Sequence, residues 1–229
     1  MPNPWDVGTA LALEQLGFEA LATTSAGYAW SLGRPDNGVR LEETLEHLRA
    51  IAGAVRLPVN ADFEGGFADE PEQVARNVKL AVATGIAGLS IEDWRNGAFY
   101  PVEEAAARIR AARQAIDASG SDVLLVGRAE AFHMPVLDLD EIIGRLKAYS
   151  AAGADVLYAP GLKRLEDVAR VVAAVDKPVN ANLTATGLSV DDFARVGVRR
   201  VSVGGALARA TYDAFDGFAK LLAEEGRLP

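Results

Sequence analysis

The chain has 229 residues, a formal net charge of −9 at pH 7 and no cysteine. The missing thiol excludes disulfides, thiolate zinc sites and a catalytic cysteine, and the acidic charge argues against nucleic acid or an anionic membrane as a partner. No charge-free apolar run is long enough to cross a bilayer, and we expect no signal segment before the fold. We therefore predict a soluble cytoplasmic protein with no membrane partner.

Short apolar strands alternate with amphipathic helices along the chain. The strands are predicted at 19–23, 58–62, 88–93, 122–128, 155–158, 178–181 and 200–203. The helices, which share an apolar spacing of three to four residues, are predicted at 6–16, 41–55, 70–84, 102–119, 137–152, 162–175, 190–196 and 206–225. This alternation predicts βα units around a parallel sheet.

The number of these units predicts the architecture. Seven strands follow the first helix and a stub at 2–4 precedes it, which gives eight βα units. We therefore expect an α/β fold, a single-domain (β/α)8 TIM barrel over 1–229, with its first strand truncated at the N-terminus. A doubly wound open sheet is the alternative, but no glycine-rich dinucleotide fingerprint follows an early strand.

The stretch 58–69 carries polar residues where a buried strand should be apolar. Asn60 and Asp62 share one face of the predicted strand, because side chains alternate between the two faces. Gly65 and Gly66 follow and allow a sharp turn. Polar groups at a strand end before a glycine turn indicate a functional site, and a loop with solvated acids is the alternative.

Polar residues also end the other predicted strands, and in a barrel these ends surround the active site. They are Thr23, Thr24, Ser25, Ser90, Glu92, Asp93, Arg128, Glu130, Asn180 and Asn182. Carboxylates with water suit Mg²⁺, and Arg128 suits a substrate carboxylate or phosphonate through a bidentate contact. The alternative is a structural network in which these charges neutralise each other. Tyr158, at another strand end, would either pack or donate to an oxyanion.

Several motifs occur together, in order and on matching strands. They are Asn3-Pro-Trp-Asp-Val-Gly8, Thr24-Ser-Ala-Gly27, Ser31-Leu-Gly-Arg-Pro-Asp36, Asn60-Ala-Asp62 with Gly65-Gly-Phe67, Ile91-Glu-Asp93 and Arg128-Ala-Glu-Ala131. Through these motifs, nearly the whole chain resembles the isocitrate lyase/phosphoenolpyruvate mutase superfamily. The resemblance implies an Mg²⁺-dependent (β/α)8 barrel that acts on a small 2-oxo or 2-hydroxy acid through an enolate.

The resemblance also implies roles for individual residues. The metal ligands, partly through bound water, would be Asp36, Asp62 and Glu92. The substrate-binding residues would be Thr24, Ser25, Asn60, Arg128 and Asn182. The catalytic residues would be Arg128, Asp62 and Glu92, with Mg²⁺ or Mn²⁺ as the cofactor that stabilises the enolate.

Three departures from the superfamily pattern narrow the expected activity. Asn60 stands where the superfamily usually has the Asp that binds the metal directly, so metal affinity should fall. The segment 94–100 lacks the Cys and His of the lyase loop, which excludes isocitrate and 2-methylisocitrate lyase activity, and the longer gating loop of the mutase is missing too. The chain also starts at the end of the first strand, and we expect superfamily members to have more N-terminal residues.

These features predict a lyase that cleaves a C–C bond of a 2-oxo acid. An oxaloacetate-like substrate is favoured, because its decarboxylation needs metal chelation but no thiol. Phosphonopyruvate or phosphoenolpyruvate P–C chemistry, of mutase or hydrolase type, is the near alternative. A family member that binds 2-oxo acids without turnover is the other, motivated by Asn60 and by the short segment 94–100.

The last predicted helix, 206–225, carries an apolar stripe through Ala210, Ala214, Phe218, Leu221 and Leu222. The resemblance implies that this helix packs on a neighbouring subunit. We therefore expect a homo-oligomer, a dimer or a tetramer. The alternative is that the helix closes its own barrel.

Overall fold

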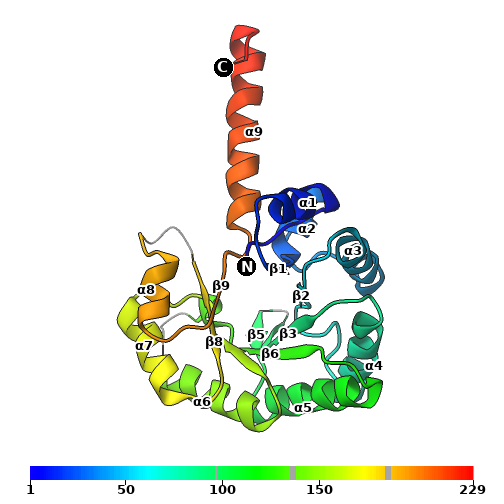
Figure 1. The fold of residues 1–229 in the computed structure, drawn as a ribbon, viewed down its shortest axis with the longest axis vertical. Helices are drawn as coiled ribbons and strands as arrows, with labels where there is room; N and C mark the ends of the chain where they lie inside the picture. The colour runs from blue at the N-terminus through cyan, green and yellow to red at the C-terminus, as the bar shows by residue number, and fades with distance from the viewer. Residues whose placement is uncertain (96, 135–137, 184–186, 229) are drawn as a thin grey trace.

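The structure is a computed structural model that describes residues 1–95, 97–134, 138–183 and 187–228. Seven parallel strands in these ranges form one sheet in the order β1-β2-β3-β6-β7-β8-β9, which curls into a nearly closed barrel (Figure 1). The strands of the barrel are β1 (Leu21–Ala22), β2 (Val59–Asp62), β3 (Gly88–Glu92), β6 (Leu124–Arg128), β7 (Val156–Tyr158), β8 (Val179–Asn182) and β9 (Arg200–Ser202). Each overlaps a predicted strand, so the predicted barrel fold is confirmed.

Helices surround the curled sheet, except for the last one, which projects away from it (Figure 1). They are α1 (Val7–Gln15), α2 (Ser25–Ser31), α3 (Leu41–Ala54), α4 (Pro71–Val82), α5 (Val102–Ser119), α6 (Leu139–Ala151), α7 (Leu165–Ala174), α8 (Val190–Arg195) and α9 (Ala206–Glu225), with a 3₁₀ turn η1 (Ala131–His133). All except α2 and the 3₁₀ turn overlap predicted helices. None of the helices in the described ranges is long and apolar enough to cross a membrane.

Besides the 3₁₀ turn η1, the helix α2 and the hairpin β4–β5 are absent from the sequence prediction. The short helix α2 is missed because Gly27 and its aromatic neighbours are poor helix formers. It forms because Thr24 caps it, with Gly27 N donating to Thr24 Oγ1 at 3.2 Å. The hairpin of β4 (Trp94–Arg95) and β5 (Ala98–Phe99) is missed because strands of two residues leave no periodic pattern.

The N-terminal residues fill the remaining place in the barrel, between β9 and β1. The Met1 amino group donates to Val201 O at 2.7 Å, and the backbone oxygen of Pro2 accepts from Ala22 N at 3.1 Å. The buried side chain of Asn3 joins the ends of the same two strands through three further hydrogen bonds. The predicted stub therefore lies where an eighth strand belongs, although it does not form a strand.

Side-chain alternation separates the interior of the barrel from its outer core. In β3, Ile91 packs in the hydrophobic core that joins the sheet to the helices, whereas Ser90 lines the interior. In β2 the same alternation turns Ala61 outward and Asn60 and Asp62 inward. The helices therefore cover apolar positions, and polar side chains gather inside the barrel.

A buried arginine holds the turn that follows β2. The guanidinium of Arg108, from α5, donates to the backbone oxygens of Gly65, Ala68 and Asp69. Gly66 in this turn has a φ of +75°, a conformation that glycine adopts readily. These contacts fix the path of the chain just after Asp62, where the polar interior reaches the barrel mouth.

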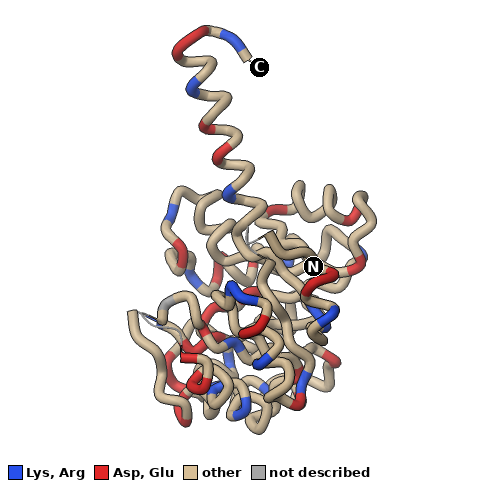
Figure 2. The backbone as a smooth tube through the Cα atoms, turned by 90° about the vertical axis from the view of Figure 1, so that its left-hand side faces the viewer, with Lys and Arg blue, Asp and Glu red and all other residues tan. Residues whose placement is uncertain are grey.

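The last helix leaves the barrel (Figures 1 and 2). Within α9, Ala208 is the single buried residue, and Phe215, Phe218 and Leu222 are at least half exposed. The alternative that this helix closes its own barrel is therefore wrong.

Candidate functional site

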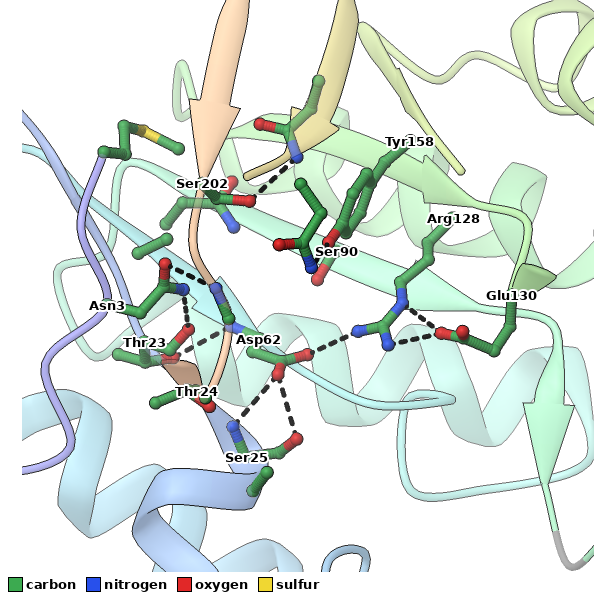
Figure 3. Close-up of a pocket in the computed structure, with 18 of the residues that line it drawn as sticks. Asn3, Thr23, Thr24, Ser25, Asp62, Ser90, Arg128, Glu130, Tyr158 and Ser202 are labelled. Carbon is green, nitrogen blue, oxygen red and sulfur yellow. Dashed lines mark hydrogen bonds and ion pairs between the residues drawn. The ribbon is translucent and has the colours of Figure 1, made fainter. Parts of the chain in front are cut away.

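A polar cavity of about 300 Å³ lies at the carboxyl ends of the strands (Figure 3). The predicted site residues that line it are Thr24, Ser25, Asp36, Asn60, Asp62, Arg128 and Asn182. Glu92 is buried and meets the lining through its ion pair with Arg128. The described part of the lining includes neither Trp94 nor Tyr100, so the hairpin does not fill the cavity. The structure thus brings all the predicted site residues together, and their individual roles stay predictions.

The guanidinium of Arg128 is the charged centre of the site. Its Nε donates to Glu130 Oε2 at 2.6 Å, and its Nη1 lies 3.1 Å from Glu92 Oε2 and 3.3 Å from Asp62 Oδ1. Figure 3 shows Asp62 and Glu130 on either side of this guanidinium. A network of neutralising ion pairs, considered above as the alternative, therefore exists around Arg128. A substrate anion that binds Arg128 would share it with these carboxylates.

Asp93 sets the position of Glu130 from behind the cavity. Its Oδ1 accepts from Glu130 N at 2.8 Å, and its Oδ2 accepts from Arg145 Nη1 at 3.0 Å and from the Tyr149 hydroxyl. All four residues are buried, where hydrogen bonds between charged groups are strong. The second acid of the Ile91-Glu-Asp93 motif is thus a structural residue that holds a partner of Arg128.

Ser25 links two of the predicted metal ligands. Its Oγ lies 2.9 Å from Asp62 Oδ2 and 3.3 Å from Asp36 Oδ1, and its backbone N donates to the same Asp62 oxygen at 3.0 Å. The neighbouring Thr24 lines the cavity, but its hydroxyl accepts the hydrogen bond that caps α2. The loop that enters α2 therefore fixes the carboxylates at the mouth.

Asn182 lines the cavity with one polar atom unpaired. Its Nδ2 donates to Tyr158 Oη at 3.0 Å, whereas its buried Oδ1 has no partner among the described residues. An unpaired buried acceptor costs free energy, so a ligand or water that donates to it would be stabilising. Burial raises the pKa of Tyr158 to about 12, so its hydroxyl stays protonated at neutral pH.

Arg200 and Ser202 of β9 are lining residues that the sequence analysis misses. Arg200 donates from Nε to Asn180 Oδ1 at 3.1 Å and from Nη1 to Asn60 Oδ1 at 3.2 Å. Ser202 Oγ accepts from Asn180 Nδ2 at 3.0 Å. The signal that could have found them is the alternation of polar and apolar residues in β9, the same pattern that identifies Asn60 and Asp62 in β2.

The acidic residues of the site repel one another. Burial raises the pKa of Asp36, and the charge of Asp62 raises it further. Burial also raises the pKa of Glu64, in the turn after β2, to about 8, and the charges of Asp62 and Asp36 contribute to this rise. Burial holds the pKa of Glu92 well above its ordinary value, although Arg128 opposes the rise. Burial and crowding therefore favour the protonated forms of these acids, and a cation bound beside them would favour the ionised forms.

Comparison with known proteins agrees with this geometry. The family model described as phosphoenolpyruvate phosphomutase matches residues 1–223. This chain belongs to the phosphoenolpyruvate phosphomutase family. The predicted membership of the isocitrate lyase/phosphoenolpyruvate mutase superfamily is therefore confirmed.

Similar sequences in the family include proteins with and without a named activity. An uncharacterized protein of Mycobacterium tuberculosis (strain ATCC 25618 / H37Rv) is 31% identical over 230 residues, which cover 100% of this chain and 86% of the relative. The 2-methylisocitrate lyase of Escherichia coli (strain K12) is 35% identical over 190 residues, which cover 78% of this chain and 62% of the lyase. Membership of the family therefore does not by itself exclude 2-methylisocitrate cleavage.

Solved structures of the superfamily are similar over the whole chain. A structure described as a lyase/mutase from Burkholderia cenocepacia J2315 has a TM-score of 0.96 and 46% identity, and the match covers 100% of this chain and 84% of that one. The structure of oxaloacetate acetylhydrolase in complex with the product oxalate has a TM-score of 0.90 and 29% identity, with coverage of 100% and 82%. The chain is thus a member of a superfamily of enzymes that cleave C–C or P–C bonds.

The resemblance to this superfamily implies a divalent metal. Within the described ranges, no three His, Cys, Asp or Glu side chains converge closely enough to hold a metal ion directly. The donor set still fits a hard cation held through water, because Asp36 and Asp62 line the cavity, Glu92 meets its wall, and a cation would relieve the repulsion between these carboxyl groups. Asn60 Oδ1, a further oxygen in the cavity, accepts a hydrogen bond from Arg200.

The raised pKa of Glu64 predicts a pH dependence of stability in EDTA. The pKa is about 8 in the folded chain and about 4.5 when unfolded, so the folded state binds this proton more tightly. The contribution of Glu64 to stability is therefore fully present below pH 4.5 and is lost as the pH rises through 8. Glu64→Gln cannot ionise, so its free energy of unfolding should exceed that of the wild type by about 1–3 kcal/mol above pH 8 and by little below pH 4.5.

Urea unfolding at several pH values measures this difference. The matched control is Glu19→Gln, which removes an exposed acid outside the helices and should not reproduce the gain in stability above pH 8. A Glu64→Gln difference that stays constant from pH 4 to pH 9 would contradict the prediction.

Proposed function

We propose that this protein is an Mg²⁺-dependent enzyme that cleaves a C–C bond of a small 2-oxo acid through an enolate, with an oxaloacetate-like substrate. One observation carries the proposal: a cluster of repelling carboxylates shares a cavity with groups that can bind an organic anion. Asp62 lies among those carboxylates, and Arg128 and Asn182 line the same cavity. The similarity to oxaloacetate acetylhydrolase supports the substrate class.

Oxaloacetate decarboxylation suits a site that has no thiol. The bond between C3 and C4 breaks, C4 leaves as CO₂, and the electron pair forms the enolate of pyruvate, which takes up a proton at C3. When bound, Mg²⁺ or Mn²⁺ would chelate the oxo acid and stabilise the negative charge that develops on its oxygen. Asp36, Asp62 and Glu92 would hold the metal, partly through water.

The chain's own residues would orient the acid. Thr24 and Ser25 would bind its carboxylate and oxo end, since their loop borders the cavity beside Asp62. Asn182 would receive a hydrogen bond at its unpaired Oδ1, and the neutral Tyr158 hydroxyl would donate one. Arg128 would bind the acid while sharing its charge with the carboxylates around it.

The absence of cysteine supports a reaction other than isocitrate or 2-methylisocitrate cleavage, because the resemblance implies a thiol for those lyases. Phosphonopyruvate P–C chemistry is the second candidate, supported by the match to the phosphoenolpyruvate phosphomutase model. A 2-oxo-acid binder without turnover is the third, supported by the neutral Asn60, two positions before Asp62 in β2.

Oxaloacetate should release pyruvate when the protein is supplied with Mg²⁺ or Mn²⁺, at a rate above that of the metal ion alone. EDTA should abolish the release, and Asp62→Ala should lower it by about 100-fold or more, because this carboxylate belongs to the predicted metal site. Asp191→Ala, which removes an exposed acid from α8, should leave the rate unchanged. A coupled pyruvate assay measures all four conditions.

The proposed function would be rejected by one broad negative result. This is the absence of product from 2-oxo and 2-hydroxy dicarboxylates and from phosphonopyruvate, with either metal. Thermal stabilisation by oxo acids without metal or product would instead favour the binder.

We also propose a homo-oligomer in which α9 packs on a second copy of the chain. Phe215, Phe218 and Leu222 expose apolar surface along this projecting helix, and such a surface is stabilised when a partner covers it. The same helix covers almost none of its own barrel.

Light scattering at micromolar concentration should therefore give at least twice the chain mass of 24.2 kDa. The substitutions Phe215→Asp and Phe218→Asp should lower the measured mass toward that of the monomer, because the new carboxylates oppose burial of the apolar face. Lys220→Asp, on the opposite face of α9, is the matched control and should leave the mass unchanged. A monomer mass for the wild type ends the proposal.

A further inference from the structure

Arg200 is a partly buried cation without an acidic partner. It lines the cavity and donates to the amide oxygens of Asn180 and Asn60, at 3.1 and 3.2 Å. Among the described residues, no Asp or Glu forms an ion pair with it, and its Nη2 group has no hydrogen-bond partner. Burial lowers the pKa of Arg200 to about 10, which still leaves the guanidinium charged at neutral pH.

The other buried arginines of the barrel have different surroundings. Arg128 and Arg145 each pair with carboxylates. Arg108 has no carboxylate at its guanidinium, but three backbone oxygens of one loop accept its hydrogen bonds. Arg200 therefore combines an uncompensated charge, a spare donor group and a place in the cavity wall. Such a charge is costly to bury unless an anion joins it.

The two amides orient this guanidinium without neutralising it. Asn60 is held closely by β3, where a Cβ on Gly88 would lie 2.8 Å from Asn60 Oδ1. Asn180 is held by Ser202, whose Oγ accepts from Asn180 Nδ2. A guanidinium held in one orientation can receive a carboxylate with little loss of side-chain entropy.

The position of Arg200 is at the floor of the cavity. Arg200 and Asn180 are paired in the sheet, two positions before the strands end at Ser202 and Asn182. Asn60 likewise lies two positions before Asp62, which is at the mouth. The cavity thus has a cationic floor beneath an acidic mouth.

We propose that Arg200 binds the carboxylate that the 2-oxo acid substrate retains. This inference rests on the proposed function and adds Arg200, from the floor of the cavity, to Thr24 and Ser25 as a ligand of that carboxylate. A guanidinium on the leaving carboxylate would stabilise its anionic form and oppose its departure as CO₂. On the retained carboxylate, the same charge binds substrate and product alike and leaves the other end of the acid at the mouth.

Calorimetric titration with oxalate in EDTA tests Arg200 without any need for turnover. Arg200→Met should weaken oxalate binding by about 10- to 100-fold, the range for a lost charged hydrogen bond. The oxalate affinity of Arg200→Lys should lie between those of Arg200→Met and the wild type, because lysine keeps the charge but cannot make a bidentate contact. The matched control is Arg199→Met, which removes the same charge from the exposed neighbour and should bind as the wild type does.

A second variant keeps Arg200 and so covers the case in which Arg200→Met does not fold. Asn60→Asp places a carboxylate where Arg200 now meets an amide, and it should weaken oxalate binding in EDTA about tenfold. Unchanged oxalate affinity in folded Arg200→Met, or in Asn60→Asp, overturns the assignment. A wild-type protein that binds no oxalate with or without Mg²⁺ also overturns it.

The same titrations separate this inference from the proposed reaction. Oxalate binding that depends on Arg200, in a protein that turns over no oxo acid, would support Arg200 and reject the reaction. Pyruvate release with an unchanged KM in Arg200→Met would support the reaction and reject Arg200.

Discussion

The ion pairs of Arg128 are the interaction on which the rest of the site depends. Carboxylates from neighbouring parallel strands meet at one edge of the barrel, where their like charges would otherwise repel. One guanidinium lets Asp62 and Glu92 lie close together, and Glu130 completes its coordination. Asp93 holds Glu130 through its backbone N, so the network extends into the core behind the cavity. The fold thus holds several acids at the mouth of the cavity. The desolvation of Arg128 and its carboxylate partners opposes this arrangement, and their ion pairs offset that cost.

Two arginines in one barrel have opposite surroundings, and the function proposed here follows from that contrast. Arg128 is surrounded by carboxylates and its charge is used within the protein. Among the described residues, Arg200 donates to two neutral amides and forms no ion pair, so its charge is available to a ligand. An acid cluster that favours a cation lies above a floor that favours an anion. A 2-oxo acid chelated to a divalent metal matches this arrangement, with the metal cation at the acidic mouth and a carboxylate at the cationic floor.

The sequence predicts the parts of this arrangement that follow from periodicity. Alternating strands and helices indicate the barrel. The alternation of polar and apolar residues in β2 indicates that Asn60 and Asp62 point into its interior. The sequence does not predict the hydrogen bond between Arg200 and Asn60, because these residues are 140 positions apart and only the curled sheet brings them together. The apolar stripe of α9 is visible in the sequence, but a stripe alone cannot say whether the helix lies on its own barrel. The raised pKa of Glu64 likewise depends on burial and on neighbours that only the fold brings together.

The most direct test of this account is a crystal structure of the protein grown with Mg²⁺ and oxalate. We expect a metal ion at the mouth between Asp62 and Glu92, with one oxalate carboxylate within hydrogen-bond distance of Arg200. A cavity that holds neither the metal nor oxalate, with Arg200 still bonded only to its two amides, would contradict it.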